Sequence, residues 1–386
     1  MKTSADIIII GGGVIGLTCA MLAAEAGKKV ILLERGKVGK ESSWAGAGII
    51  PPGNSKNTEH PGDRLRAWSS EQFPLFSEEL QKRTGIDNGY FRCGGLEWLD
   101  ENQVDNLVES WQREQIPFEA IEAKKGSQLW PQLDCWRLVG KERAFYFPSM
   151  AQVRNPRHLK ALFSSCIELG VEVKENQERV RFQTGESSQK IIGVMNDENN
   201  LFNAEHYLIA SGAWSDELTV PLGVSLGVKP VRGQIITYQL GGVPFREVIL
   251  MGKCYLVPRQ DGLLLVGATE EWQAGYAKEI TESGREDLRQ FAEKICPELR
   301  KEKIVHQWAG LRPGSSSPSC VPIIDRLQDY PEIWVSTGHF RAGIQLSIGS
   351  ARYWLDQILQ RPSFLPLGAF PLQGKRDDHW SPAFRS

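Results

Sequence analysis

The hydrophobic residues near the start of the chain predict a strand, a helix and a second strand. Ile7 to Ile10 is an unbroken β-branched run, which is typical of a parallel strand buried on both faces. A glycine-rich turn follows, and the pattern of Val14 to Ala26 predicts a helix that ends at Gly27. Lys29 to Glu34 (KVILLE) is a second apolar run. Together these segments predict a βαβ unit of about 30 residues.

Further along the chain the pattern changes from helical spacing to alternation. Arg64 to Arg83 is amphipathic and predicts a helix, and Asn155-Pro156 predicts an N-cap and first turn for another. Residues 206–214 predict a strand that meets a glycine turn. Residues 227–270 alternate apolar and polar positions between glycine turns, which predicts several antiparallel strands.

The composition is that of an ordinary globular protein with no electrostatic bias. At about 150 residues per domain, the 386 residues predict two to three domains. The 45 basic and 47 acidic residues leave a net charge of −2. This balance argues against a nucleic-acid-binding protein, which needs a surplus of basic residues.

The cysteines and the apolar segments indicate where we expect the chain to work. The seven cysteines are scattered without a CxxC pair, so we expect a reduced chain with no metal site and no disulfide framework. The most apolar N-terminal stretch, residues 7–24, is broken by four glycines, which fits neither a signal peptide nor a membrane span. We therefore expect a cytoplasmic protein.

The turn after the first strand carries the pattern Gly11-x-Gly13-x-x-Gly16, and Glu34 ends the next strand. In such a unit the first glycine makes the tight turn, the second lets backbone N–H groups approach a pyrophosphate, and the third lets the helix pack on the strand. The acidic residue would accept hydrogen bonds from ribose hydroxyls. The unit predicts dinucleotide binding and disfavours a 2′-phosphate, which leaves FAD and NAD.

The rest of the chain favours FAD. A small-residue loop at 42–50 follows the Glu34 strand, and further glycine turns lie at 210–214 and 338–343. Three separated turns that converge on one extended cofactor suit FAD, although spacing alone leaves NAD open.

These motifs resemble those of the glycine oxidases, a family of the D-amino-acid oxidase superfamily that serves thiamine biosynthesis. The resemblance runs from residue 6 to about residue 360. It rests on the stretches GGGVIG (11–16), SSWAGAGI (42–49), ASGAWS (210–215), VRGQ (231–234), CYLVPR (254–259), WAGLRPG (308–314) and GHFRAGI (338–344).

The resemblance implies non-covalent FAD, oxidative deamination of small amines, hydrogen peroxide as by-product and a homotetramer. It implies cofactor contacts from Gly11, Gly13, Val14, Ile15, Gly16, Glu34, Arg35, Ser42, Ser43, Ala45, Gly46, Ala47, Gly48, Val180, Gly212, Trp214, Gly233, His339, Arg341, Ala342, Gly343 and Ile344. The bound flavin would carry the chemistry, so no side chain is expected as a catalytic acid or base.

The resemblance also implies a small set of substrate contacts. Arg312 would hold the substrate carboxylate through two parallel hydrogen bonds, and Tyr255 would bind the same carboxylate. Arg341 would lie at the entrance or against the flavin edge, and Ile49 would crowd the flavin side. We disfavour His339 as a base, because its turn is expected to serve the flavin.

The chain departs from the family pattern in two places near the expected site. Ala342 replaces the asparagine of GHFRNG, and GATEEWQAG is one residue longer than the related stretch. Both bear on substrate preference. Cys254 and Cys320 are expected to be packing residues, because the sarcosine oxidases that bind flavin covalently have a cysteine where this chain has Arg312.

We therefore predict an α/β protein with a Rossmann-type FAD-binding domain and a second, α+β domain for the substrate, built on a large antiparallel sheet. The FAD-binding domain would comprise residues 1–84, 151–220 and 306–386, and the substrate domain residues 85–150 and 221–305. The predicted function is oxidation of glycine, sarcosine or small D-amino acids by O₂, with the product feeding thiazole synthesis. The alternatives are a dehydrogenase of the same fold that reduces a quinone, and a non-catalytic flavin-bearing subunit.

Overall fold

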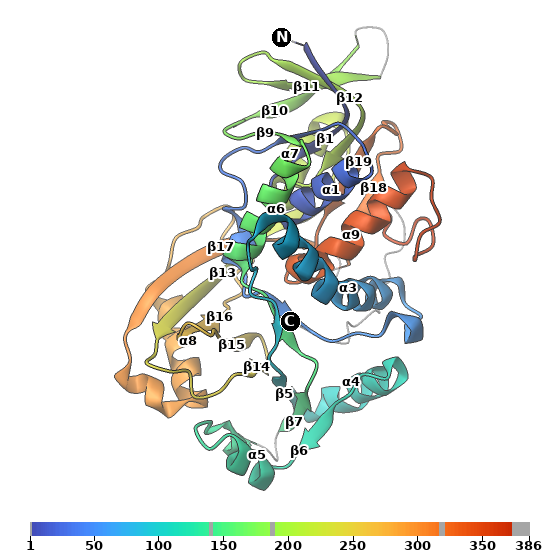
Figure 1. The fold of residues 1–386 in the computed structure, drawn as a ribbon. Helices are drawn as coiled ribbons and strands as arrows, with labels where there is room; N and C mark the ends of the chain where they lie inside the picture. Colours follow the sequence, from blue (N-terminus) through green and yellow to red (C-terminus); the bar gives the residue numbers. More distant parts are fainter. Residues whose placement is uncertain (1, 139–141, 186–189, 316–320, 373–386) are drawn as a thin grey trace.

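The computed structural model describes residues 2–138, 142–185, 190–315 and 321–372, which fold around two large sheets. In Figure 1 the first sheet lies in the upper part of the molecule with several helices against it, and the second sheet lies below. The long strands β13 (Val228–Gln239) and β17 (Ile304–Ser315) pair with each other in the region where the two parts meet.

The first sheet has a parallel centre. Its path is β10–β11–β12–β1–β2–β9, and β19 pairs with β12 and β18. The strands are β1 (Lys2–Ile10), β2 (Val30–Leu33), β9 (Glu172–Lys174), β10 (Val180–Thr184), β11 (Ile191–Asn196), β12 (Leu201–Ile209), β18 (Ile323–Arg326) and β19 (Ile333–Thr337).

The isoleucine run of β1 explains why this sheet is buried on both faces. Ile8 and Ile10 belong to a core on one face of the sheet, and Ile7 and Ile9 belong to a core on the opposite face. The second of these cores also includes residues of four helices, α1 (Val14–Glu25), α3 (Pro61–Thr84), α6 (Asn155–Glu168) and α9 (Gly343–Ile358). Successive side chains of a strand point to opposite faces, so only a continuous apolar run can fill both cores. Because β1 pairs in parallel with β2 and β12, and β12 pairs in parallel with β19, the carboxyl ends of these four strands meet at one edge of the sheet.

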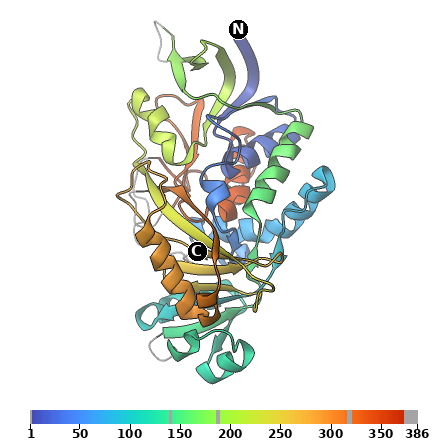
Figure 2. The same cartoon turned by 90° about the vertical axis from the view of Figure 1, so that its left-hand side faces the viewer.

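The second sheet is antiparallel except for the parallel pair β5–β14. Its order is β17–β13–β16–β15–β14–β5–β7–β6. The strands are β5 (Gly95–Asp100), β6 (Glu119–Ile121), β7 (Glu142–Phe147), β13 (Val228–Gln239), β14 (Val248–Met251), β15 (Cys254–Pro258), β16 (Leu263–Gly267) and β17 (Ile304–Ser315). Helix α8 covers one face, and Figure 2 shows it (orange) beside this sheet. Helix α4 contributes Trp111 to the core on the other face.

The remaining elements connect or cover these sheets. A small sheet joins β3 (Ile49–Ile50), β8 (Ala151–Gln152) and β4 (Phe91–Arg92). The helices are α1 (Val14–Glu25), α2 (Ser42–Ala45), α3 (Pro61–Thr84), α4 (Glu101–Glu114), α5 (Ala123–Leu129), α6 (Asn155–Glu168), α7 (Ser215–Thr219), α8 (Glu282–Ile295) and α9 (Gly343–Ile358), with 3₁₀ turns at Ser55–Asn57, Cys135–Leu138, Gly212–Trp214, Val220–Leu222 and Pro297–Lys301.

The predicted fold class is confirmed, with a Rossmann-like parallel sheet and a large, mainly antiparallel second sheet. The domain boundaries remain a prediction. One of them, at residue 306, falls inside β17, and β17 pairs with β13 of the second sheet from Ile304 to Ser315. The strand that carries Arg312 is therefore part of the second sheet, whereas the predicted boundary assigns it to the FAD-binding domain.

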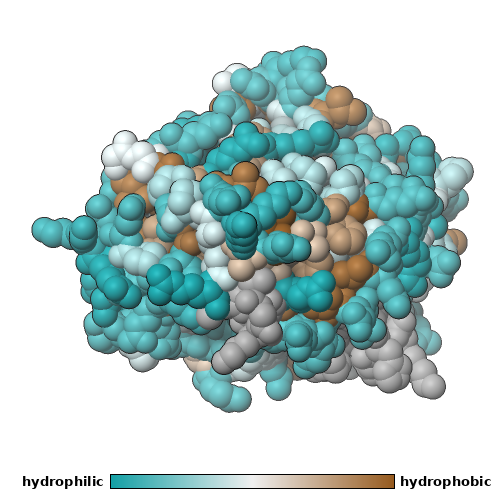
Figure 3. Space-filling view, turned by 90° about the horizontal axis from the view of Figure 1, so that it is seen from below, coloured by the Kyte–Doolittle hydropathy of each residue, from teal (hydrophilic) through white to brown (hydrophobic). Residues whose placement is uncertain are grey.

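The surface and helices of the described residues bear on the expectations about membranes and cysteines. Among the described helices, none is both long and apolar enough to cross a bilayer. The face shown in Figure 3 is mainly hydrophilic, with hydrophobic residues in smaller groups. Six cysteines lie in the described part of the chain and all are free thiols, while Cys320 lies outside it.

Candidate functional site

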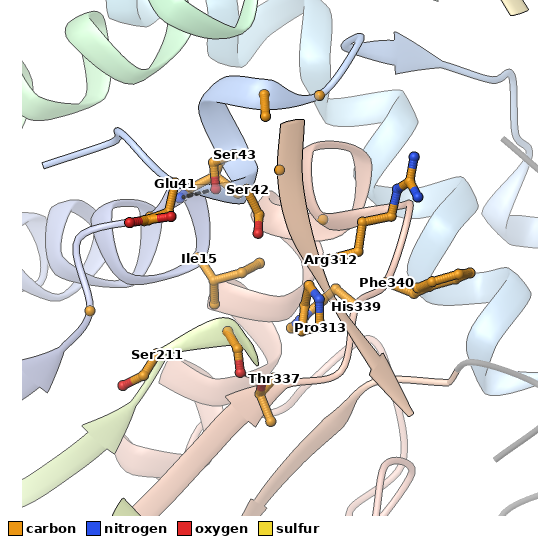
Figure 4. Close-up of a pocket in the computed structure, with 18 of the residues that line it drawn as sticks. Ile15, Glu41, Ser42, Ser43, Ser211, Arg312, Pro313, Thr337, His339 and Phe340 are labelled. Atoms are coloured by element: carbon orange, nitrogen blue, oxygen red, sulfur yellow. Dashed lines mark hydrogen bonds between the residues drawn. The ribbon is translucent and has the colours of Figure 1, made fainter. Parts of the chain in front are cut away.

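A cavity of about 560 Å³ extends between the two sheets and takes its walls from both. Every residue that the sequence predicts as a site residue lines this cavity, with the exception of Gly16. Figure 4 shows Ile15, Ser42, Ser43 and Ser211 on one side of β17, while the side chain of Arg312 extends to the other side. Lining residues therefore lie on both sides of this strand.

The glycine turn at the start of α1 is shaped by two close backbone contacts. Gly11 has a φ of +116°, which favours glycine. A β-carbon added at Gly16 would lie 1.9 Å from the carbonyl oxygen of Gly11, so only glycine lets the helix pack this closely on the turn. Gly16 therefore supports the turn from behind, whereas Gly11 and Gly13 line the cavity.

Glu34 follows β2 and is held beside the glycine turn. Its Oε2 accepts a hydrogen bond from the backbone N–H of Gly12 at 2.7 Å, and its Oε1 accepts one from Gly36 at 2.8 Å. A carboxylate has about four acceptor positions, so these two bonds fix its orientation and leave capacity for ribose hydroxyls.

The loop after β2 lies against the N-terminus of α1. Ser43 Oγ accepts from the backbone N–H of Val14 at 3.0 Å, and Asn155 Nδ2 donates to the carbonyl of Ser43 at 2.7 Å. Asn155 does not cap its helix: it is the first residue of α6, and Arg154 is at the cap position without a side-chain cap bond. The prediction of an Asn155 N-cap was wrong, because its side chain holds the loop instead.

The same loop is also tied to β17 of the second sheet. Ser42 Oγ donates to the carbonyl of Leu311, and Trp308 Nε1 donates to the carbonyl of Ala45 at 3.0 Å. A β-carbon added at Gly310 would lie 2.5 Å from that of Ala45. The loop and the strand that carries Arg312 are therefore in direct contact.

An aromatic and basic cluster lies at the end of the cavity near the first sheet. The Arg35 guanidinium lies 4.2 Å from the ring centre of Trp214, and Tyr276 stacks on Trp214 with ring centres 5.7 Å apart. Glu41 lies 3.6 Å from Arg35 and 3.0 Å from Lys278. Tyr276 and Lys278 come from the loop after β16, and the sequence analysis did not single them out.

These features fit a dinucleotide with a pyrophosphate. The N-terminus of α1 provides backbone N–H groups and a partial positive charge at the glycine turn, which suits phosphates. Glu34 is positioned for a ribose, and the small residues of the loop leave room for an extended molecule. FAD would be held by the glycine turn, Glu34, the loop at 42–48 and the turns at 211–214 and 339–344.

Arg312 and Tyr255 lie together in the part of the cavity next to the second sheet. Each side chain packs directly against a glycine of a neighbouring strand. Arg312 Nη1 donates to the carbonyl of Thr269 at 2.9 Å, and a β-carbon added at Gly233 would lie 2.2 Å from Arg312 Nη2. A β-carbon added at Gly267 would lie 2.6 Å from the Tyr255 hydroxyl. Neighbouring strands β13 and β16 thus supply flat surfaces against which the two polar groups lie.

The electrostatics of this pair suit an anion. Burial lowers the pKa of Arg312, an effect that the neighbouring Tyr255 hydroxyl opposes. Burial raises the pKa of Tyr255 above its usual value of 10, so the hydroxyl keeps its proton at neutral pH and can donate it in a hydrogen bond. The pair can therefore offer a guanidinium and a phenol to one carboxylate.

Arg341 and His339 lie in the turn before α9. Arg341 Nη2 forms an ion pair with Glu270 Oε2. His339 Nε2 lies 3.0 Å from Ser350 Oγ, and burial lowers the pKa of His339 to about 3. The imidazole is therefore a weak base, and its ring is bonded to Ser350 of α9. This is consistent with the expectation that His339 is not a catalytic base. Ile49 is half-buried in the cavity wall.

The structure adds residues that sequence reasoning missed, and it locates Ala342, which departs from the family pattern. Glu97 of β5 is 5% exposed and lines the cavity; it lies opposite Leu250 in the sheet, as Tyr255 does on the other side. Its position in the stretch GGLEWLD gave no signal, since a polar residue in a strand usually faces solvent. Cys254 also lines the cavity, and Ala342 is at the cap position of α9 without a side-chain cap bond.

Comparisons with known proteins agree with this site. The glycine oxidase of Pseudomonas aeruginosa is 33% identical over 96% of this chain and 100% of its own length. The bifunctional protein ThiO/ThiG of Trichormus variabilis is 30% identical over 93% of this chain and 53% of its own length. The crystal structure of glycine oxidase from Geobacillus kaustophilus superimposes with a TM-score of 0.86 at 26% identity, covering 97% of this chain and all of that one. The family model described as FAD dependent oxidoreductase (DAO) matches residues 6–357, and the chain belongs to this family.

Proposed function

We propose that the protein is an FAD-dependent amino-acid oxidase that acts on glycine and on similarly small amines such as sarcosine and small D-amino acids. The observation that carries the proposal is the joint occurrence, in one cavity, of a dinucleotide-type turn and a half-buried Arg312–Tyr255 pair. The similarity to the Pseudomonas aeruginosa glycine oxidase over its whole length supports the choice of substrate.

The substrate would bind through its carboxylate. The planar guanidinium of Arg312 can form two parallel hydrogen bonds to a carboxylate, and the Tyr255 hydroxyl can donate a third. Because Arg312 already donates to Thr269 and is pressed against Gly233, its position is set before the substrate arrives. A preset donor loses less conformational entropy on binding.

The amine would be oxidised in its neutral form. Bound FAD supplies the acceptor for the hydride that leaves the substrate's α-carbon. The chain's own residues hold the substrate, exclude water and keep the carboxylate in place. Burial lowers the pKa of His339 to about 3 and its ring is bonded to Ser350, so it is a weak proton acceptor.

Further parts of the proposal concern the surroundings of the reaction. We propose that O₂ reoxidises the enzyme with release of hydrogen peroxide, that FAD is bound without a covalent link, and that the chain assembles as a homotetramer in the cytoplasm. A relative in which this type of chain forms part of a ThiO/ThiG protein supports a role in supplying a thiazole synthase.

A peroxide assay across amino acids tests the proposal. The purified holoenzyme is supplied with glycine, sarcosine, and D- and L-forms of alanine and proline, and peroxide and ammonia or amine are measured. We expect activity with glycine, sarcosine and small D-amino acids, and little with the L-forms. Absence of peroxide together with reduction of an artificial electron acceptor would instead indicate a dehydrogenase.

A further inference from the structure

Three cationic side chains line the part of the cavity near Arg312 and Tyr255. Two of them pair with the same carboxylate, which does not itself line the cavity. Arg312, Arg341 and Lys253 line the cavity, whereas Glu270 does not. Arg341 Nη2 pairs with Glu270 Oε2, and Lys253 Nζ lies 3.3 Å from Glu270 Oε1. Glu270 thus offsets one of the two positive charges that Arg341 and Lys253 bring to the wall.

The Glu270 carboxylate is firmly ionised and well shielded. Its side chain is 12% exposed and that of Arg341 is 18% exposed. Burial alone would raise the pKa of Glu270, but hydrogen bonds from Trp272 and Arg341 and the charges of Arg341 and Lys253 lower it to about 2. It therefore carries its negative charge over the whole physiological pH range.

The position of this ion pair matters because it adjoins Arg312, which is proposed to bind the substrate carboxylate. Arg312 donates to the carbonyl of Thr269, which is the residue before Glu270. The Arg341 guanidinium lies 5.5 Å from the Phe340 ring, and that ring packs on the half-exposed Trp272. A group attached to the α-carbon or amine of a substrate held by Arg312 would approach this wall.

We propose that Glu270 is a specificity-determining residue that excludes substrates with a second carboxylate. This inference rests on the proposed function. Glu270 offsets the charge of Arg341, so a second carboxylate that approached Arg341 would meet the like charge of Glu270 beside it. The Lys253 side chain is 71% exposed, so solvent screens its charge. Without the charge of Glu270, Arg341 would present its guanidinium to the cavity as a second anion site. Glu270 acts through Arg341, so it is a positioning residue.

The sequence offers a matched control in the next residue. Glu271 also pairs with an arginine, since its Oε2 lies 2.5 Å from Arg232 Nη2. Neither Glu271 nor Arg232 lines the cavity. Glu271→Gln therefore makes the same chemical change one position away, without freeing an arginine of the cavity wall.

The first test measures ligand binding and does not depend on turnover. Malonate and its monoamide, malonamate, have nearly the same shape and differ by one negative charge. Their dissociation constants are measured by the change in flavin absorbance in the parent, Glu270→Gln and Glu271→Gln holoenzymes. We expect the malonate-to-malonamate affinity ratio to rise by about 10- to 100-fold in Glu270→Gln, since like-charge juxtaposition is strongly unfavourable in a buried site. It should stay within about twofold of the parent in Glu271→Gln.

A second test uses turnover of D-aspartate and D-asparagine, which form the same kind of isosteric pair. The D-aspartate-to-D-asparagine ratio of kcat/KM should rise in Glu270→Gln, and the rise should disappear in Glu270→Gln/Arg341→Gln. A ratio unchanged in Glu270→Gln, or raised equally by Glu271→Gln, would overturn the inference. Failure of the parent to oxidise any amino acid would instead contradict the proposed function, and the malonate ratio would still decide the role of Glu270.

Discussion

Replacing Gly233 by alanine should damage substrate binding through the displacement of Arg312. In the structure the Arg312 guanidinium lies directly on Gly233, in the space that a side chain would fill. A β-carbon there would lie 2.2, 2.4 and 2.5 Å from Nη2, Cζ and Nη1 of Arg312, whereas ordinary van der Waals contact begins at 3.4 Å. To reach ordinary contact the guanidinium must therefore retreat by about 1.2 Å, or the strand must move.

The size of the effect follows from that displacement. A misplacement of about 1 Å in a reacting complex costs on the order of 100-fold in rate. At 1.36 kcal/mol per decade this corresponds to about 2.7 kcal/mol of transition-state stabilisation. The value lies within the roughly 2–5 kcal/mol that truncating one partner of a buried charge pair costs. We therefore expect kcat/KM for glycine to fall by about 100-fold in Gly233→Ala.

The assay compares glycine with a small amine that has no carboxylate, in the parent and in Gly233→Ala. Both rates are expressed per bound flavin, because Gly233 lines the cavity and is an expected cofactor contact. On this basis the rate of amine oxidation should fall little, because the amine does not use Arg312. Gly241→Ala is the matched control, since a β-carbon added at Gly241 meets nothing within 4 Å. Oxidation of glycine by Gly233→Ala within threefold of the parent would refute the assignment of Arg312 as the carboxylate ligand.

Three further predictions concern the cofactor contact of Glu34, the substrate contact of Arg312 and the dependence of folding stability on pH. Glu34→Ala should weaken FAD binding by about 1–3 kcal/mol through loss of charge-assisted hydrogen bonds, as measured by titration of the apoprotein, and unchanged affinity would remove Glu34 from the site. Arg312→Ala should lower kcat/KM for glycine by about 30- to 5,000-fold with unchanged flavin content, and Arg312→Lys should be impaired less, because lysine keeps the charge but not the planar fork. For His339, burial lowers the pKa from 6.5 to about 3, so its contribution to folding stability is complete above pH 6.5 and is lost as the pH falls toward 3. His339→Asn should therefore unfold with a shallower dependence on pH over that interval in urea titrations, and an unchanged slope would contradict the burial of a neutral imidazole.

The sequence predicted the cofactor half of the molecule well because its signals are local. The strand, glycine turn and helix that begin at Ile7 follow from hydrophobic pattern and glycine spacing within one βαβ unit. The prediction of Glu34 beside the turn needed only the end of the next strand. In the structure its carboxylate lies there, bonded to the backbone of Gly12 and Gly36.

The substrate half was harder because its geometry depends on pairing between distant strands. The contact between Arg312 and Gly233 arises because β17 pairs with β13, and the two residues are far apart in the sequence. The pairing of Arg341 with Glu270 joins the turn before α9 to the loop after β16. Periodicity within either segment carries no information about such a contact.

The same limitation explains one wrong prediction and one residue that the sequence analysis missed. Asn155 before Pro156 has the sequence of an N-cap, yet its amide holds the loop at Ser43, a contact made possible only by the packing of α6 against that loop. Glu97 sits in a strand pattern without any distinguishing neighbour, and only the sheet order brings it to the cavity. Tertiary contacts decided both positions.

The central claim is that glycine binds beside the cofactor through Arg312 and gives up its hydride there. Mixing the holoenzyme with glycine in the absence of oxygen, and following the flavin absorbance, tests this most directly. The account predicts that glycine bleaches the flavin of the parent, that Arg312→Ala bleaches at least about 30-fold more slowly, and that air restores the colour with formation of peroxide. A parent flavin that stays oxidised with glycine, sarcosine and small D-amino acids alike would contradict it.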